Sequence, residues 1–172
     1  MVVVSFLLIR LRYVYRIVNM YGILDIEGIQ RDKEHVCIRK FYILASDGVI
    51  DCEREFNVCL PFQKLKKKYQ TAFIFCKNKI HKLNYYPEGI SMSCSLAVDT
   101  LRTFVEENGI NIVFFKGGII ERRLCEKAEV KYFDIGRLVP KVNCHDPRTE
   151  VHLHFDYLTL NCKDEIEKII SR

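Results

Sequence analysis

The sequence has few of the residues that build linkers, fibres or repeat arrays. Its 172 residues include only eight glycines and four prolines, too few for long flexible linkers or a collagen-like chain. No C-x-x-C pair, internal repeat or low-complexity segment occurs in it. Composition therefore excludes a fibre, a disordered tail and a repeat array, and it leaves one domain large enough to bury a core.

Long apolar runs are missing as well. Residues 2–9 are apolar, but Arg10 ends the run well short of the roughly 20 residues that span a bilayer. No basic residue precedes the run and no small-residue cleavage site follows it, so the sequence favours neither a signal peptide nor a membrane partner. We expect residues 1–19 to be an N-terminal extension, with Met20 as an alternative natural start, and residues 20–172 to be the domain.

Charge and cysteine usage place the chain among basic, thiol-containing proteins. It has 27 Lys and Arg against 22 Asp and Glu, a formal net charge of +5, which permits a nucleic-acid partner without requiring one. Its eight cysteines are scattered, and several, such as Cys76, lie in apolar stretches. This pattern is typical of reduced core thiols and predicts an intracellular protein, nuclear or cytoplasmic.

Hydrophobic patterning predicts an α/β domain. Strands are expected over residues 21–27, 36–45, 49–58, 111–115 and 130–135. Helices are expected over residues 61–82, 95–108 and 119–127, and from Asp146 and Pro147 towards residue 170. Short turns join the first three strands, whereas helices separate the later ones. We therefore expect a mixed five-stranded sheet, three antiparallel strands followed by two parallel ones, with flanking helices.

Two acids stand on the first expected strand. Asp25 and Glu27 are two residues apart, so their side chains share one face. Burying such charges costs several kcal/mol unless they are paired or bind metal. Mg²⁺ or Mn²⁺ ions shared by several carboxylates would solve this, and two ions roughly 4 Å apart support phosphodiester cleavage. The alternative is a strand end where both acids reach solvent.

Further acids and a histidine stand near helix starts. Glu121 lies in the first turn of a helix that follows a strand and the Gly117-Gly118 turn, which would aim its carboxylate at the first strand. His145 precedes Glu150 by five positions, with a helix start between them. A histidine can act on water while an acid holds metal. Alternatively, Glu121 and Glu150 are ordinary N-terminal acids that complement the helix dipole.

The order of these motifs resembles the DEDDh exonuclease superfamily, whose domain has the ribonuclease-H-like fold. That family carries Asp-x-Glu on its first strand, an Asp in a helix after the fourth strand and His-x4-Asp at the final helix. The matching segments here are LDIEG, FKGGIIERRL and HDPRTE. The sequence is also similar to a group of uncharacterised invertebrate proteins that share DIEG and KGG-x-x-E.

The resemblance covers about residues 20–160 and implies a 3′-to-5′ exonuclease acting on single-stranded DNA or RNA. It implies Mg²⁺ or Mn²⁺ as the cofactor, with His145 acting on the attacking water. The implied metal ligands are Asp25, Glu27, Glu121 and Glu150.

Two departures open a second hypothesis. Glu121 and Glu150 stand where the family has Asp, and the longer side chains would shift the spacing of the two ions. In addition, His152, His154 and Asp156 offer a competing register for the histidine and acid. The alternative is therefore a catalytically inactive ribonuclease-H-like module that binds nucleic acid or protein.

Cysteine and histidine concentrate near the C-terminus. Zinc takes four such ligands tetrahedrally. The candidate zinc ligands are Cys144, His152, His154 and Cys162. The Maelstrom domain, which resembles the same fold and binds zinc through Glu, Cys and His, is a similar case. The alternative is an exposed histidine pair beside two core thiols.

Lysines concentrate in the helix expected over residues 61–82. Seven of them alternate there with aromatic residues such as Tyr69, Phe73 and Phe75, a pattern typical of single-strand binding. Lys116, beside the Gly117-Gly118 turn, could meet a phosphate. The predicted nucleic-acid-binding residues are Lys64, Lys67, Lys68 and Lys116. The alternative is a solvated helix face over core aromatics.

Overall fold

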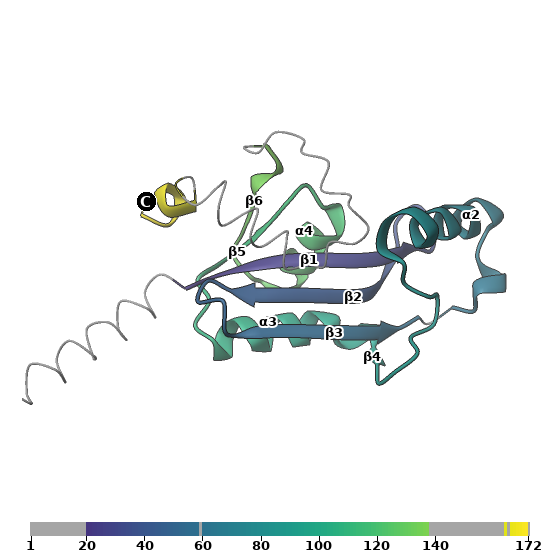
Figure 1. Ribbon diagram of the computed structural model, residues 1–172, viewed down its shortest axis with the longest axis horizontal. Coiled ribbons are helices and arrows are strands. Elements are labelled where there is room, and N and C mark those ends of the chain that lie inside the picture. Colours follow the sequence, from purple (N-terminus) through teal and green to yellow (C-terminus); the bar gives the residue numbers. More distant parts are fainter. Residues whose placement is uncertain (1–19, 59, 138–163, 165, 172) are drawn as a thin grey trace, which may run out of the picture.

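The computed structural model describes residues 20–58, 60–137, 164 and 166–171 (Figure 1). Within them, one mixed sheet has the strand order β4-β3-β2-β1-β5-β6. The strands are β1 (Tyr21–Gln30), β2 (Val36–Ala45), β3 (Asp51–Asn57), β4 (Met92–Ser93), β5 (Ile112–Phe115) and β6 (Tyr132–Asp134). The helices are η1 (Phe62–Lys64), α2 (Lys67–Cys76), η2 (Lys77–His81), η3 (Cys94–Leu96), α3 (Ala97–Glu107), α4 (Ile119–Ala128) and η4 (Ile135–Arg137). The α/β class is confirmed.

The strand pairing matches the expected arrangement at its centre. Antiparallel pairing joins β1 to β2 and β2 to β3, whereas β5 runs parallel to β1 and β6 parallel to β5. The expected count of five strands is wrong, because β4 adds a sixth at the edge through Phe56 and Asn57 of β3. A strand of two residues is too short to show alternating hydrophobicity, so the sequence pattern could not reveal it.

The single helix expected over residues 61–82 is divided into three parts. Leu65 and Lys66 are extended, with ψ angles of 143° at both residues, and they separate η1 from α2. The extended backbone allows Leu65, only 4% exposed, to pack with Tyr69 and Phe73 in one core cluster. After α2 the chain makes the π-helical turn η2, which ends at Lys82 in the left-handed region with φ 60°.

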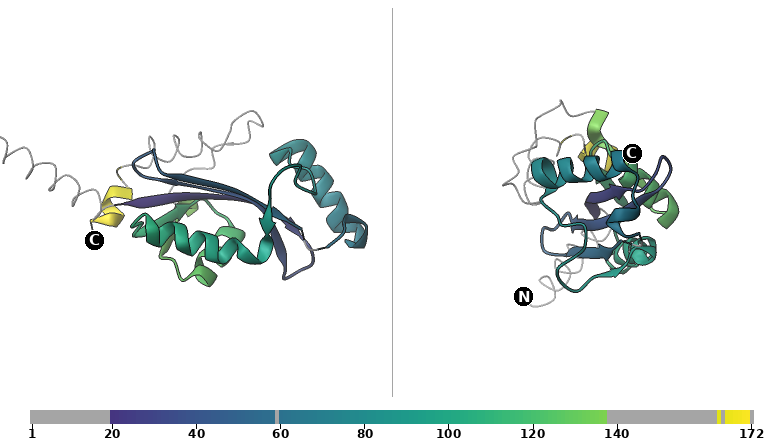
Figure 2. Two further views of the ribbon diagram at one scale, coloured as in Figure 1. Left: turned by 90° about the horizontal axis from the view of Figure 1, so that it is seen from below. Right: turned by 90° about the vertical axis from the view of Figure 1, so that its right-hand side faces the viewer.

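The strand β1 divides the core because its side chains alternate between the two faces of the sheet. Leu24 and Ile26 belong to the cluster that includes α3 and α4. On the opposite face Ile23 packs with Ile166, and Ile29 packs with residues of α2. Figure 2 shows α3 running along the sheet while α2 lies at one end of it. Asp25 and Glu27 therefore share the face that carries α2, between two apolar clusters.

Cysteines in the described part of the chain behave as expected for thiols. Cys37, Cys52 and Cys125 are buried, Cys76 and Cys94 are half-buried, and none of these five is in a disulfide. Burial raises the pKa of Cys125 to about 12, with smaller contributions from Glu121 and Glu126. This thiol therefore stays protonated and packs as a small apolar group.

The α3 contact with the sheet predicts a stability difference between two leucines. Leu101 is fully buried in the main cluster, whereas Leu96, at the end of η3, is 42% exposed. Leu101→Ala should lower the free energy of unfolding by about 3 kcal/mol, and Leu96→Ala by less than about 1 kcal/mol. Urea unfolding of both variants measures this, and equal losses would contradict the packing of α3.

Candidate functional site

The first two candidate acids lie on β1 beyond its pairing with β5. Ile23 is the last β1 residue in register with β5, so Asp25 and Glu27 come after the parallel pairing. On the other side, Asp25 lies opposite Tyr42 and Glu27 opposite Lys40 of β2. Both acids are half-buried. They stand at the carboxyl end of parallel strands, where open α/β sheets commonly bind ligands.

Glu121 is packed against the turn that starts α4. Gly118 is the N-cap of α4, and Glu121 lies in the first turn with only 8% of its surface exposed. A Cβ atom built on Gly118 would lie 1.5 Å from Oε2 and 2.2 Å from Cδ of Glu121. The carboxyl group therefore occupies the space that any larger residue at position 118 would fill.

The environment of Glu121 joins it to β1. The pKa of Glu121 is raised to about 7, chiefly by burial and to a smaller extent by the nearby carboxylates of Asp25 and Asp134. Hydrogen bonds from the backbone amides of Glu121 itself and of Ile26 act in the opposite direction. The structure thus brings Glu121 to the strand that carries Asp25, as the Gly117-Gly118 turn predicts.

Asp134, at the end of β6, is the residue that sequence reasoning missed. Its Oδ1 accepts hydrogen bonds from the amides of Gly117 at 2.7 Å and Gly136 at 2.9 Å. Its Oδ2 pairs with Arg122 of α4 at 3.5 Å. Gly117 has φ 70°, a conformation that favours glycine, and Asp134 fixes it there. The available signal was an acid at the end of a strand adjacent to the strand over 111–115.

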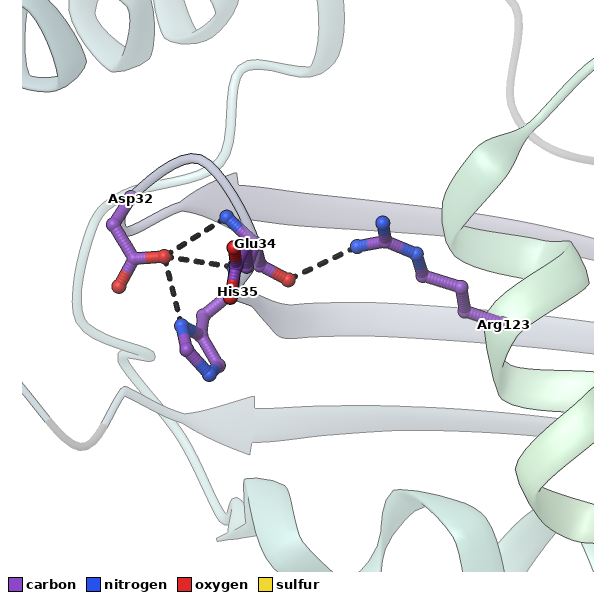
Figure 3. A network of polar contacts seen from close by, with 4 residues as sticks. All are labelled: Asp32, Glu34, His35 and Arg123. Carbon is purple, nitrogen blue, oxygen red and sulfur yellow. Dashed lines mark hydrogen bonds and ion pairs between the residues drawn. The ribbon is translucent and has the colours of Figure 1, made fainter.

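A second polar network anchors α4 at the hairpin between β1 and β2 (Figure 3). Asp32 Oδ1 accepts hydrogen bonds from the amides of Glu34 and His35 at 3.0 and 2.9 Å and lies 2.7 Å from His35 Nδ1. These hydrogen bonds lower the pKa of Asp32 to about 2. Arg123 of α4 donates to the Glu34 carbonyl at 3.0 Å. Contacts at the hairpin and at Asp134 therefore hold the first turns of α4, and with them Glu121.

The predicted nucleic-acid-binding residues lie in two places. Lys116 follows β5 directly and is half-buried next to the glycine turn, whereas Lys64, Lys67 and Lys68 are exposed on η1 and α2. Cys76, the last residue of α2, lies near Glu27 of β1: burial raises the pKa of its thiol, and the carboxylate of Glu27 raises it further. The end of α2 therefore borders the acids of β1.

The remaining predicted residues cannot be placed. The histidine, the fourth acid and the candidate zinc ligands lie outside the described residues; these are His145, Glu150, Cys144, His152, His154 and Cys162. The competing Asp156 lies there too. Among residues 20–58, 60–137, 164 and 166–171, no group of three or more His, Cys, Asp or Glu side chains is arranged to hold a metal ion.

Neither a protein-family model nor a curated protein sequence matches the chain. No helix in the described ranges is long and apolar enough to cross a membrane.

The buried carboxyl group predicts a pH-dependent stability. The pKa of Glu121 in the folded chain, about 7, is above its ordinary value of 4.5, so the folded state binds the proton more tightly. The contribution of Glu121 to stability is then fully present below about pH 4.5 and is lost as pH rises through about 7, in total by roughly 3 kcal/mol. Urea unfolding at several pH values should show this decline. Glu121→Gln should flatten it, and the exposed-site control Glu107→Gln should retain it; an unchanged wild-type midpoint would contradict the burial.

The glycine at the N-cap of α4 predicts a specific local change. Gly118→Ala places a methyl group where the Glu121 carboxyl lies, so this flexible side chain should move towards solvent. The pKa of Glu121 should then return towards 4.5, which carboxyl NMR titration can follow. Gly89→Ala is the matched control, because nothing lies within 4 Å of its added Cβ. A pKa still near 7 in Gly118→Ala would show that the carboxyl does not pack there.

Proposed function

We propose that this chain is a metal-dependent nuclease-type domain of ribonuclease-H-like fold, a 3′-to-5′ exonuclease on single-stranded DNA or RNA. The observation that carries the proposal is the buried carboxyl of Glu121 next to Asp25, beyond the end of β5. Like charges brought together in a partly dry place are unfavourable on their own, and a divalent cation is the partner that such oxygen donors prefer.

The topology supports the proposed fold. Three antiparallel strands come first in the chain, and β5 and β6 then extend the sheet in parallel on the other side of β1. The acids follow in the order that the resemblance implies, with Asp25 and Glu27 on the central strand and Glu121 in the helix after β5. Strand order and acid order therefore agree with one family.

The residues have distinct roles in this proposal. Asp25, Glu27 and Glu121 would hold the cation only after the Glu121 carboxyl turns away from the Ile26 amide, because the described acids are not already arranged as a metal site. Asp134 positions the glycine turn, because both of its oxygens already have partners. A bound Mg²⁺ or Mn²⁺ supplies an activated water and stabilises the leaving oxygen of a phosphodiester. Lys116, beside the same turn, is placed to meet a substrate phosphate. The proposed roles of His145 and Glu150, on water and metal, follow from the resemblance alone.

A nuclease assay tests the proposal. End-labelled single-stranded DNA and RNA are incubated with the full chain and Mn²⁺, and labels at either end report the polarity. Asp25→Ala/Glu27→Ala and Glu121→Gln should each lower the rate by about 100-fold or more, since both remove metal ligands. Glu106→Gln/Glu107→Gln, exposed acids of α3, is the control and should degrade both substrates normally. Equal degradation by wild type and Asp25→Ala/Glu27→Ala would overturn the proposal.

A catalytically inactive binding module is the second candidate. The Glu121 carboxyl packs against Gly118 and accepts a hydrogen bond from the Ile26 amide, so it already has a structural role without a metal ion. Binding of an oligonucleotide without degradation in the same assay would favour this candidate. Metal analysis of the purified chain tests whether this binding module holds zinc. Stoichiometric zinc that is lost in Cys144→Ser supports a zinc site, and absence of zinc removes it.

A further inference from the structure

One segment of the chain is strongly basic and lacks acids altogether. Residues 56–87 contain seven lysines and His81 but no Asp or Glu. The exposed members are Lys64, Lys66, Lys67, Lys68, Lys79 and Lys82. Among the described residues, none of these lysines forms an ion pair with a carboxylate. No carboxylate of the described residues therefore neutralises the positive charge of these lysines, although Lys68 Nζ lies over the ring of Tyr69, 4.7 Å from its centroid.

The outer face of α2 combines this charge with an exposed aromatic ring. Residues seven apart on a helix share a face, so Lys68 lies in line with Phe75 and Lys67 with Ile74. Phe75 is 59% exposed and Ile74 48% exposed, and Thr71 is exposed between the two rows. These five residues, Lys67, Lys68, Thr71, Ile74 and Phe75, are here named the α2 surface.

The opposite face of α2 is already committed to the core. Tyr69 and Phe73 are each 7% exposed and pack with Ile29 and Tyr85. The rings of Phe73 and Tyr85 meet edge to face, with centroids 5.3 Å apart. The α2 surface therefore has a fixed position, and Phe75 is outside the aromatic cluster that holds the helix.

The end of α2 lies near the acids of β1, on the side of the helix opposite the α2 surface. Cys76, the last residue of α2, comes seven residues after Tyr69 and is half-buried on the same side, and the carboxylate of Glu27 raises the pKa of its thiol. In Figure 1, α2 lies over the end of the sheet where β1 ends.

We propose that the α2 surface binds single-stranded nucleic acid, with Lys67 and Lys68 on its phosphates and a base stacked on Phe75. The proposal rests on the proposed function for its class of ligand. Single-strand binding that tolerates many sequences combines two kinds of contact. Lysines bind the phosphate backbone, and an exposed aromatic ring stacks on a base. In a duplex the bases are already stacked inside, so the ring would have no base to meet.

An anionic membrane surface fits the α2 surface less well. A helix that lies in a membrane interface buries a broad apolar face. In α2 that face, with Tyr69 and Phe73, is inside the protein, and only Ile74 and Phe75 are apolar on the outside. The exposed apolar area therefore suits a single stacked base better than a lipid layer.

A fluorescence experiment tests the stacking. The chain contains no tryptophan, so Phe75→Trp introduces a single reporter at the α2 surface. A short single-stranded oligonucleotide, added in EDTA to prevent cleavage, should quench this tryptophan, and the matched duplex should not. Phe75→Leu should bind the oligonucleotide roughly 10-fold more weakly than wild type, whereas Ile74→Ala should change binding by less than about twofold. Binding without quenching in Phe75→Trp, or equal binding by Phe75→Leu and wild type, would overturn the proposal.

A charge comparison tests the lysines. Lys67→Glu/Lys68→Glu should weaken binding by at least about 10-fold and make it less dependent on salt, because two phosphate contacts are lost. The control Lys127→Glu/Lys131→Glu makes the same change in net charge at two exposed positions, one in the last turn of α4 and one just before β6. It should bind the oligonucleotide like wild type, apart from a small loss of affinity caused by the lower net charge. Equal weakening by the two double variants would show that only net charge matters, and it would overturn the assignment of a surface.

The outcomes also separate this proposal from the nuclease proposal. Asp25→Ala/Glu27→Ala should bind the oligonucleotide at least as tightly as wild type. Quenching without any metal-dependent degradation leaves the α2 surface in place and removes the nuclease. Metal-dependent degradation without quenching of the Phe75→Trp fluorescence supports the nuclease proposal and removes the α2 surface as the binding site. Binding to phosphatidylcholine–phosphatidylserine vesicles but not to oligonucleotides, or self-association that Phe75→Leu abolishes, would assign the α2 surface to a membrane or to a second copy instead.

Discussion

The burial of the Glu121 carboxyl is the constraint on which the arrangement of the site depends. Such a group loses hydration, and the neighbouring Asp25 and Asp134 make its ionised form less favourable still. The amide of Ile26 offsets part of this cost, but only because the carboxyl can fold over the bare Cα of Gly118. Gly117 must in turn adopt a positive φ, which Asp134 stabilises by accepting its amide hydrogen. The carboxyls of Glu121 and Asp134 together thus connect β1, the turn after β5, the start of α4 and the end of β6.

Much of the sheet follows from local pattern, and the exceptions have local causes. Alternating and continuous apolar stretches reveal five strands, and the short turn at Gly48, with φ 69°, reveals the antiparallel start. The break before α2 was not visible, because Leu65, Tyr69 and Phe73 repeat every four residues as in one unbroken helix. The four-residue spacing correctly predicts that these three side chains are buried. It does not reveal that Leu65 reaches the core from an extended backbone.

The candidate site divides in the same way. An acid pair on a central strand and an acid after a glycine turn can be recognised from spacing, and in the structure Asp25 lies near enough to Glu121 to raise the pKa of Glu121. Asp134 was not readable, because its role depends on the amide of Gly117, seventeen residues earlier in the chain. Only the parallel pairing of β5 and β6 places those two residues side by side. Tertiary contacts of this kind leave little trace in one sequence.

The length of the side chain at position 121 explains why a glutamate is suited to this place. The carboxyl must extend from the first turn of α4 back over Gly118 to the Ile26 amide of β1. An aspartate, shorter by one methylene group, would hold its carboxyl nearer to its own helix. The glutamate at position 121 therefore matches a glycine three residues earlier, and the two positions have to be considered together. In the proposed nuclease the Glu121 carboxyl would have to exchange the Ile26 amide for a cation held together with Asp25, and the longer side chain would allow that exchange.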